Sequence, residues 1–155
     1  MKIVGIDPGV TGAIAMHDAG VLTDVRDMYS ADSRTDGAAL YEVLDSYGSD
    51  VTVYLENTQA MPKNGSIASY SLGLNTGIVV GVVQSLALPL VRVRPAAWKQ
   101  KMGVTRMDKN AIRGIVREIY PQWANLFDRV KDHNRAEAVL ISRYGVAASL
   151  QEANT

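Results

Sequence analysis

Apolar positions along the chain fall into short runs typical of β-strands and longer periodic stretches typical of helices. The strand-like runs cover residues 2–7, 13–17, 21–28, 50–56 and 90–94. The segment "DAG" at residues 18–20 is a tight turn, so the second and third runs should form a hairpin. The last two runs alternate with helical stretches, which favours parallel pairing there. The pattern predicts a mixed sheet that begins as an antiparallel meander.

Helical periodicity follows between these runs. After a cap at Thr35 or Asp36, one helix places its apolar residues on a single face: Leu40, Val43, Leu44 and Tyr47. Ser66 would cap a long helix that runs to about Leu88, because Pro89 then breaks it. The remaining helices are expected at about 95–99, 108–120 and 134–150, and residues 30–35 are expected to form a loop.

A five-stranded mixed sheet flanked by helices is an α/β fold, and 155 residues suffice for one domain with a sizeable core. We expect residues 1–150 to form this domain and residues 151–155 to be a frayed tail. Cysteine is absent, which excludes disulfides, zinc–thiolate sites and cysteine nucleophiles. The most apolar stretch, residues 77–91, is too short to span a bilayer, and Asp7 interrupts the only segment that could be a signal peptide.

Charge is distributed unevenly, although the formal net charge is zero. Eight of the sixteen basic residues lie between Arg92 and Arg117, where Asp108 is the one acid. A solvated helix face is the alternative explanation, but such faces usually mix Lys with Glu. A basic segment that follows an acidic first half of the chain indicates phosphate contacts beside a cation-binding centre.

Carboxylates stand at the ends of two predicted strands. Asp7 ends the first strand and Glu56 the fourth, so both acids emerge at one edge of the sheet if these strands are neighbours. A cluster at the start of the last helix adds Asp132, His133 and Glu137. Oxygen ligands without cysteine suit Mg²⁺ or Mn²⁺, and two such ions can promote phosphodiester hydrolysis. Alternatively, Asp7 is a turn residue, Glu56 a capping or salt-bridged carboxylate, Asp132 a helix cap, and Glu137 the partner of a buried arginine.

Four segments together resemble the RuvC-type Holliday-junction resolvases, and bacteriophage-encoded members in particular. They are "GIDPGVTGAIA", "VYLENTQAMPKNG", "SLGLNTGIVVGVV" and "DHNRAEAVLISRYG". The likeness covers nearly the whole chain. It implies a ribonuclease-H-like fold, a homodimer, and a divalent-metal-dependent endonuclease that resolves four-way DNA junctions by paired symmetrical nicks.

The resemblance also implies roles for individual residues. The acidic ligands of the family match two strand ends and one acid early in the last helix: Asp7, Glu56 and Glu137. They would hold two Mg²⁺ ions per active site, with Mn²⁺ as a substitute. Asn134 stands where well-known members have Asp or His, so Asp132 or His133 would have to supply the fourth ligand. Lys99 or Lys109 would neutralise the phosphate during catalysis.

Further implied contacts with DNA come from the basic segment and from the loop before the long helix: Lys63, Asn64, Arg94, Lys99, Lys101, Arg106, Lys109 and Arg113. Met61 stands in that loop where well-known members have an aromatic residue that enters the junction. Gly73, Gly77 and Gly81 recur every four residues on one helix face. They would either pack on the sheet of the same chain or meet a two-fold-related copy.

Three other functions compete with junction resolution. A nuclease for flaps or RNA–DNA hybrids would need the same acids, and a catalytically inactive junction-binding module would need only the basic surface. An actin-like ATPase would need a second domain to clamp its nucleotide, for which the chain is too short. We therefore expect branched DNA and a second copy of the chain as partners, no membrane and no nucleotide cofactor, in the cytoplasm of a bacterial or phage-infected cell.

Overall fold

A five-stranded sheet forms the centre of the computed structural model, which describes residues 1–59 and 63–153. The strand order is β3-β2-β1-β6-β7, with β1–β2–β3 antiparallel and β1–β6–β7 parallel. The strands are β1 (Lys2–Asp7), β2 (Ala13–Asp18), β3 (Val21–Asp27), β6 (Val51–Glu56) and β7 (Leu90–Val93). The predicted mixed sheet is confirmed, with the first and fourth predicted strands as neighbours.

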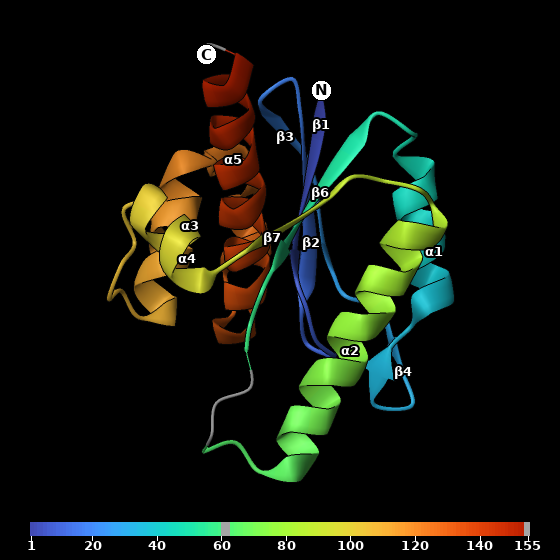
Figure 1. The fold of residues 1–155 in the computed structure, drawn as a ribbon. Helices are drawn as coiled ribbons and strands as arrows, with labels where there is room; N and C mark the ends of the chain where they lie inside the picture. The colour runs from blue at the N-terminus through green and yellow to red at the C-terminus, as the bar shows by residue number, and fades with distance from the viewer. Residues whose placement is uncertain (60–62, 154–155) are drawn as a thin grey trace.

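Helices cover both faces of this sheet (Figure 1). One face carries α1 (Gly37–Ser46) and α2 (Ser66–Ser85). The other carries α3 (Pro95–Lys101), α4 (Lys109–Ile119) and α5 (His133–Ala153), with short 3₁₀ helices at Pro121–Phe127 and Val130–Asp132. Asp36 caps α1 by accepting hydrogen bonds from the N–H groups of Ala38 and Ala39, and Asp108 caps α4 by accepting one from Ala111.

Each face of the sheet has its own hydrophobic core, because successive side chains of a strand point in opposite directions. Ile3 joins the core beneath α4 and α5, whereas Val4 and Ile6 join the core beneath α1 and α2. All three side chains are fully buried. The near-continuous apolar pattern of β1 therefore reflects a strand covered on both faces.

Two glycines allow α5 to lie directly on the sheet. A Cβ atom built on Gly5 of β1 would lie 2.3 Å from the backbone N of Ser142 and 2.4 Å from the carbonyl oxygen of Ala138. A Cβ atom on Gly145 would lie 2.6 Å from the side chain of Ile3. Helix and strand backbones are thus closer than any side chain at these positions would permit.

Residues 30–35 differ from the predicted loop. Strands β4 (Ser30–Ala31) and β5 (Arg34–Thr35) form a small hairpin beside α2. The buried Asn75 side chain of α2 accepts hydrogen bonds from the N–H of Thr35 at 2.7 Å and from its hydroxyl at 3.0 Å. Strands of two residues are too short to leave a periodic pattern, which is why the sequence did not reveal them.

Helix boundaries also differ from the prediction at three places. Gly65 is the N-cap of α2, so Ser66 is its first helical residue rather than its cap. The helix ends at Ser85 instead of Leu88, because Ala87 adopts a left-handed conformation with φ of 52°. The last helix continues through Ala153, within the segment that we expected to fray.

Helix α2 is long and apolar enough to span a membrane by length and composition, with a mean hydropathy of 1.5 and 17% of its apolar window buried. One such helix is weak evidence for a membrane protein. Asn75 and Val79 of this helix pack into the protein, while Ile67 and Tyr70 are 84% and 71% exposed. One side of α2 is therefore exposed, because no other element of the single chain that the structure describes covers it.

Replacing Gly5 by Ala should test the close approach of α5. The added methyl group would overlap backbone atoms that cannot rotate away, so we expect a loss of about 1–3 kcal/mol in the free energy of unfolding. Urea titration followed by circular dichroism measures this loss. Gly114→Ala in α4 is the matched control, because it meets nothing described within 4 Å and should stabilise the helix by up to about 1 kcal/mol. Equal stabilities of the two variants would contradict the proposed packing.

Candidate active site

Asp7 and Glu56 lie side by side at one edge of the sheet. The parallel register pairs Ile6 with Leu55, so the next residues on β1 and β6 are these two acids. Neighbouring strands are about 4.8 Å apart, and side chains at the same register point to the same face. Alternation along the strands places both carboxylates on the face of Gly5 and Tyr54, which is the face covered by α5.

Helix α5 brings a third carboxylate to this edge. Because Ala138 lies against Gly5, the preceding residue, Glu137, lies beside the end of β1. Burial raises the pKa of Asp7 well above its usual value, and the negative charges of Glu137 and Glu56 raise it further. Burial likewise raises the pKa of Glu137, and the charge of Glu56 adds to the effect. The three acids therefore repel one another at a poorly solvated site.

Two cations partly offset this repulsion. The ammonium group of Lys99 lies 3.7 Å from Oε1 of Glu137, and the charges of Lys99 and Lys109 lower the pKa of Asp7. The ammonium group of Lys99 also lies 5.2 Å from the centre of the Trp98 ring. Both lysines come from the basic segment, so the structure places part of the predicted phosphate-binding surface at the predicted acidic centre.

Glu56 is held by two neutral hydrogen-bond donors. The buried indole of Trp98 donates from Nε1 to Oε1 at 2.8 Å, and the hydroxyl of Thr58 donates to Oε2 at 3.0 Å. Trp98 is fully buried, and its polar contact was not predicted from the sequence. A tryptophan that precedes a lysine in a short helix gives no sequence signal that its N–H binds a carboxylate.

His133 and Lys109 form a further contact at this site. Nδ1 of His133 is 3.0 Å from the carbonyl oxygen of Val130, and Nε2 is 2.9 Å from the ammonium group of Lys109. A carbonyl can only accept, so Nδ1 carries the proton in this arrangement and Nε2 accepts a hydrogen bond from Lys109. The imidazole is therefore neutral and oriented by two partners.

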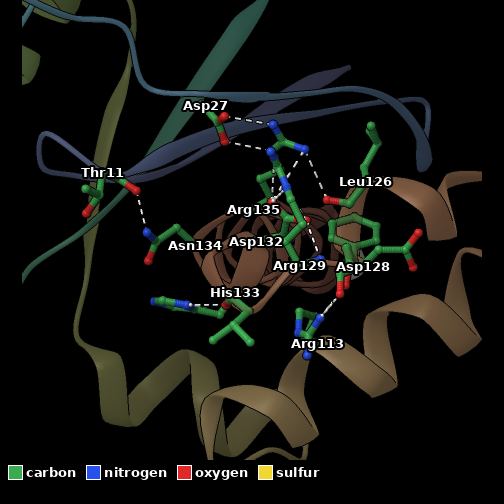
Figure 2. A network of polar contacts seen from close by, with 12 residues as sticks. Thr11, Asp27, Arg113, Leu126, Asp128, Arg129, Asp132, His133, Asn134 and Arg135 are labelled. Atoms are coloured by element: carbon green, nitrogen blue, oxygen red, sulfur yellow. Dashed lines mark hydrogen bonds and ion pairs between the residues drawn. The ribbon is translucent and has the colours of Figure 1, made fainter.

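Asp132 is held by two arginines near the start of α5 (Figure 2). Its side chain is 2% exposed, and its oxygens accept from the backbone N–H and the guanidinium group of Arg129 at 2.8 Å each. Arg135 lies 3.8 Å away and binds both carboxylate oxygens of Asp27 on β3. The structure thus places Asp132 in the capping role that was the alternative to metal binding.

Asn134 connects α5 to the turn after β1 (Figure 2). Its side-chain amide donates a hydrogen bond to the carbonyl oxygen of Thr11. Together with the ion pair between Arg135 and Asp27, this contact fixes the first turn of α5 against β1, β2 and β3. Asn134, the position compared above with Asp or His of the resembled family, has a positioning role here.

The predicted DNA-binding residues separate into two groups. Arg113 is engaged within the protein, because its guanidinium group donates to the carbonyl oxygens of Phe127 at 3.0 Å and Asp128 at 2.5 Å. The others, apart from the half-buried Lys99, have exposed side chains: Lys63, Asn64, Arg94, Lys101, Arg106 and Lys109. Met61, the predicted substitute for an aromatic residue, lies outside the described residues.

No group of three or more His, Asp or Glu side chains within residues 1–59 and 63–153 is arranged closely enough to hold one metal ion as it stands. The acids are instead bound by Trp98, Thr58 and Lys99. Their chemistry still fits a hard divalent cation, since carboxylate oxygens are its preferred ligands and their mutual repulsion favours one. Asp7, Glu56 and Glu137 are the residues that could hold it.

Two solved structures of RuvC resemble this fold. Thermus thermophilus RuvC in complex with a Holliday junction substrate has a TM-score of 0.72 and 18% sequence identity, over 98% of this chain and 96% of that chain. A second Thermus thermophilus RuvC structure has a TM-score of 0.66 and 18% identity, over 96% and 97% of the two chains. The ribonuclease-H-like fold is therefore confirmed.

A curated sequence relative is the chloroplastic Holliday junction resolvase MOC1 of Chlamydomonas reinhardtii, which is 26% identical over 98 residues. The match covers 63% of this chain and 11% of that protein. No protein-family model matches the chain. These relatives come from a bacterium and an alga, so the likeness to bacteriophage members stays a prediction.

Replacing Asp132 by Asn should destabilise the fold at neutral pH. Burial raises the pKa of Asp132, but hydrogen bonds from Arg129 and the charge of Arg135 outweigh it and leave the pKa below its usual value. The ionised group therefore stabilises the protein above its unfolded pKa of about 3.9, and this stabilisation disappears as the pH falls through the lower folded pKa. We expect a loss of about 2 kcal/mol at pH 7 and almost none near pH 2 in urea titrations.

Asp128→Asn is the matched control, because Asp128 is 56% exposed and forms a surface ion pair with Arg117. We expect it to change the free energy of unfolding by less than about 1 kcal/mol. Calorimetric titration with Mg²⁺ separates the two roles of Asp132. Unchanged stability with weakened Mg²⁺ binding in Asp132→Asn would show that Asp132 is a metal ligand after all.

Proposed function

We propose that this protein is a metal-dependent endonuclease that resolves four-way DNA junctions. The observation that carries this proposal is the gathering of Asp7, Glu56 and Glu137 at one sheet edge, with Lys99 and Lys109 beside them. Two likenesses support the choice of substrate. They are the fold shared with a RuvC structure in complex with a Holliday junction substrate, and the sequence likeness to a chloroplastic resolvase. Such an enzyme would act in the cytoplasm of a bacterial or phage-infected cell.

Asp7, Glu56 and Glu137 would hold Mg²⁺, for which Mn²⁺ would substitute, and two ions per site would suit this chemistry. A bound divalent cation acidifies water and stabilises a leaving oxygen in phosphodiester hydrolysis. Water attacks phosphorus, the bond to the 3′ oxygen breaks, and the products carry a 3′ hydroxyl and a 5′ phosphate. Glu137, once it held the cation, would no longer bind the ammonium group of Lys99, and Lys99 would be free to contact the phosphate.

Lys109 and His133 would assist this reaction as a pair. In the free protein Lys109 donates to Nε2 of His133. A phosphate that attracts the Lys109 ammonium group would leave Nε2 unpaired, and a neutral imidazole with a free lone pair can accept the proton of the attacking water. The hydrogen bond from Nδ1 to Val130 would keep the ring in place.

The exposed side of α2 supports a homodimer. Gly73, Gly77 and Gly81 are exposed, and a Cβ atom on any of them would meet no described atom within 4 Å. Packing on the sheet of the same chain therefore does not explain them, although each costs up to about 1 kcal/mol of helix stability relative to Ala. A second copy of α2 could approach this glycine face closely, and a two-fold dimer matches the two equivalent strands of a junction.

A cleavage assay tests the proposed function directly. Purified protein with Mg²⁺ is offered a synthetic four-way junction, a flap, a plain duplex and an RNA–DNA hybrid. We expect paired symmetrical nicks in the junction alone. Cutting of the flap or the hybrid at equal rates would favour a different nuclease, and binding of the junction without cutting would favour an inactive binding module.

Asp7→Asn should separate catalysis from folding. The neutral amide cannot hold the cation, so we expect cutting to fall by at least about a thousandfold while junction binding persists. In the presence of EDTA the variant should be more stable than the wild type at pH 7, because it removes a carboxylate whose pKa is raised by burial and repulsion. Asp18→Asn, near the opposite end of the sheet, is the control and should change neither property. Parallel loss of cutting and stability in Asp7→Asn would contradict the proposed role.

Gly77→Arg should abolish dimerisation. The long charged side chain would keep two α2 helices apart, so we expect a monomer in sedimentation velocity and single nicks in place of paired cuts. Gly114→Arg on α4 adds the same side chain at another open helical glycine and should leave the dimer intact. A Gly77→Arg protein that sediments like the wild type would rule out the glycine face as the interface.

A further inference from the structure

A hollow lies on the α5 face of the sheet, away from the carboxylate centre. It has a volume of about 550 Å³. Its walls come from the ends of α3 and α4 and from the second half of α5, and include Lys101, Met102, Ile119, Arg143, Val146 and Leu150. His17 at its base pairs with Ile3 on β1, four residues before Asp7. At about 3.3 Å per residue, this separates the hollow from the acids by roughly 13 Å along the strand.

A chain of buried hydrogen bonds forms the base of the hollow. The Ser142 hydroxyl donates to the carbonyl oxygen of Val139, so it accepts from Nδ1 of His17 at 2.9 Å. Nε2 of His17 then accepts from the Tyr120 hydroxyl at 2.8 Å, and that hydroxyl accepts from Arg143 at 3.1 Å. Burial lowers the pKa of His17 to about 4, with a further contribution from Arg143, so the imidazole is neutral at pH 7.

These hydrogen bonds hold Arg143 in place at the wall of the hollow. Its guanidinium group donates to the Tyr120 hydroxyl and lies 5.8 Å from the centre of the Tyr120 ring. None of the ion pairs found within residues 1–59 and 63–153 involves Arg143 or Lys101. Two cations that form no ion pair with an acid of the described residues therefore stand beside an apolar hollow.

A second depression lies beside α3. It is lined by Ala97, Gln100, Lys101 and Tyr144, so Lys101 stands where the two meet. We call the hollow and this depression together the groove, and its lining residues Leu150 and Ile119 are 55% and 39% exposed. Bare phosphates would leave these apolar walls unused, which favours an occupant with apolar side chains over DNA.

We propose that this groove binds an acidic peptide segment of a partner protein, with a large apolar side chain in the hollow and carboxylates on Arg143 and Lys101. Charge complementarity and the apolar walls select this chemistry. The volume suits one or two large side chains. The glycine face of α2 lies on the other side of the sheet, so a second copy of the chain and a bound peptide would not compete (Figure 1). The inference does not depend on junction cleavage.

Fluorescence anisotropy with a labelled peptide tests this proposal. The probe is fluorescein-Asp-Glu-Asp-Gly-Leu-Phe with a free α-carboxylate, and two comparison peptides replace Leu-Phe by Ala-Ala or the acids by Lys. We expect saturable binding of the first peptide alone, weakened by added salt. Equal binding of all three peptides, or of none, would overturn the proposal.

Variants at the groove locate the site. Arg143→Gln removes one cation, and Leu150→Asp places a negative charge in the groove lining, so each should weaken binding by roughly tenfold. Arg34→Gln on the small hairpin removes the same charge elsewhere and should bind like the wild type. Melting temperatures within a few degrees of the wild type exclude misfolding. Arg143→Gln should also retain full activity toward a four-way junction without peptide.

Competition identifies other occupants. Displacement of the peptide by junction DNA would show that the peptide binds to the basic DNA-binding surface, and would overturn the proposal. Binding of octanoate without binding of the peptide would show a site for small apolar acids and would overturn it as well. Loss of dimer in Arg143→Gln during sedimentation would assign the groove to a second copy of the chain and would also contradict it.

Discussion

The mutual repulsion of three carboxylates at a buried sheet edge is the constraint on which the rest of the structure depends. Asp7 is 9% exposed, and its pKa is raised by burial and by two neighbouring acids. Such an arrangement destabilises the folded chain at neutral pH unless cations stand close by. Lys99 and Lys109 supply part of that charge. Under the proposed function, a bound divalent cation would offset this cost and would supply the chemistry that phosphodiester hydrolysis requires.

The approach of α5 to β1 brings the centre together. Gly5 and Gly145 let the helix backbone lie against the strand, and this places Glu137 beside Asp7. The first turn of α5 is then fixed at three points, by Asn134 on Thr11, by Arg135 on Asp27, and by the cap that Asp132 forms with Arg129 (Figure 2). Glycines and buried polar contacts each lower stability in isolation. Here they position the acids of one site.

Much of this arrangement could be predicted from the sequence. The mixed pairing followed from a hairpin turn and from alternation of strands with helices. The shared edge of Asp7 and Glu56 was expected only if their strands were neighbours, which the structure shows. The partners of individual side chains could not be predicted, because they depend on rotamers and on tertiary contacts far apart in the chain. Spacing alone cannot show that Trp98 binds Glu56, that Arg113 is engaged by backbone carbonyls, or that Asp132 turns toward Arg129.

The central claim is that Asp7, Glu56 and Glu137 converge on divalent cations. Anomalous diffraction from crystals soaked in Mn²⁺ tests it most directly, because the metal is located without reference to activity. The account predicts anomalous density within about 2–2.6 Å of carboxylate oxygens of Asp7 and of at least one of the other two acids. Density at Asp132, or no density at this edge of the sheet at saturating Mn²⁺, would contradict it.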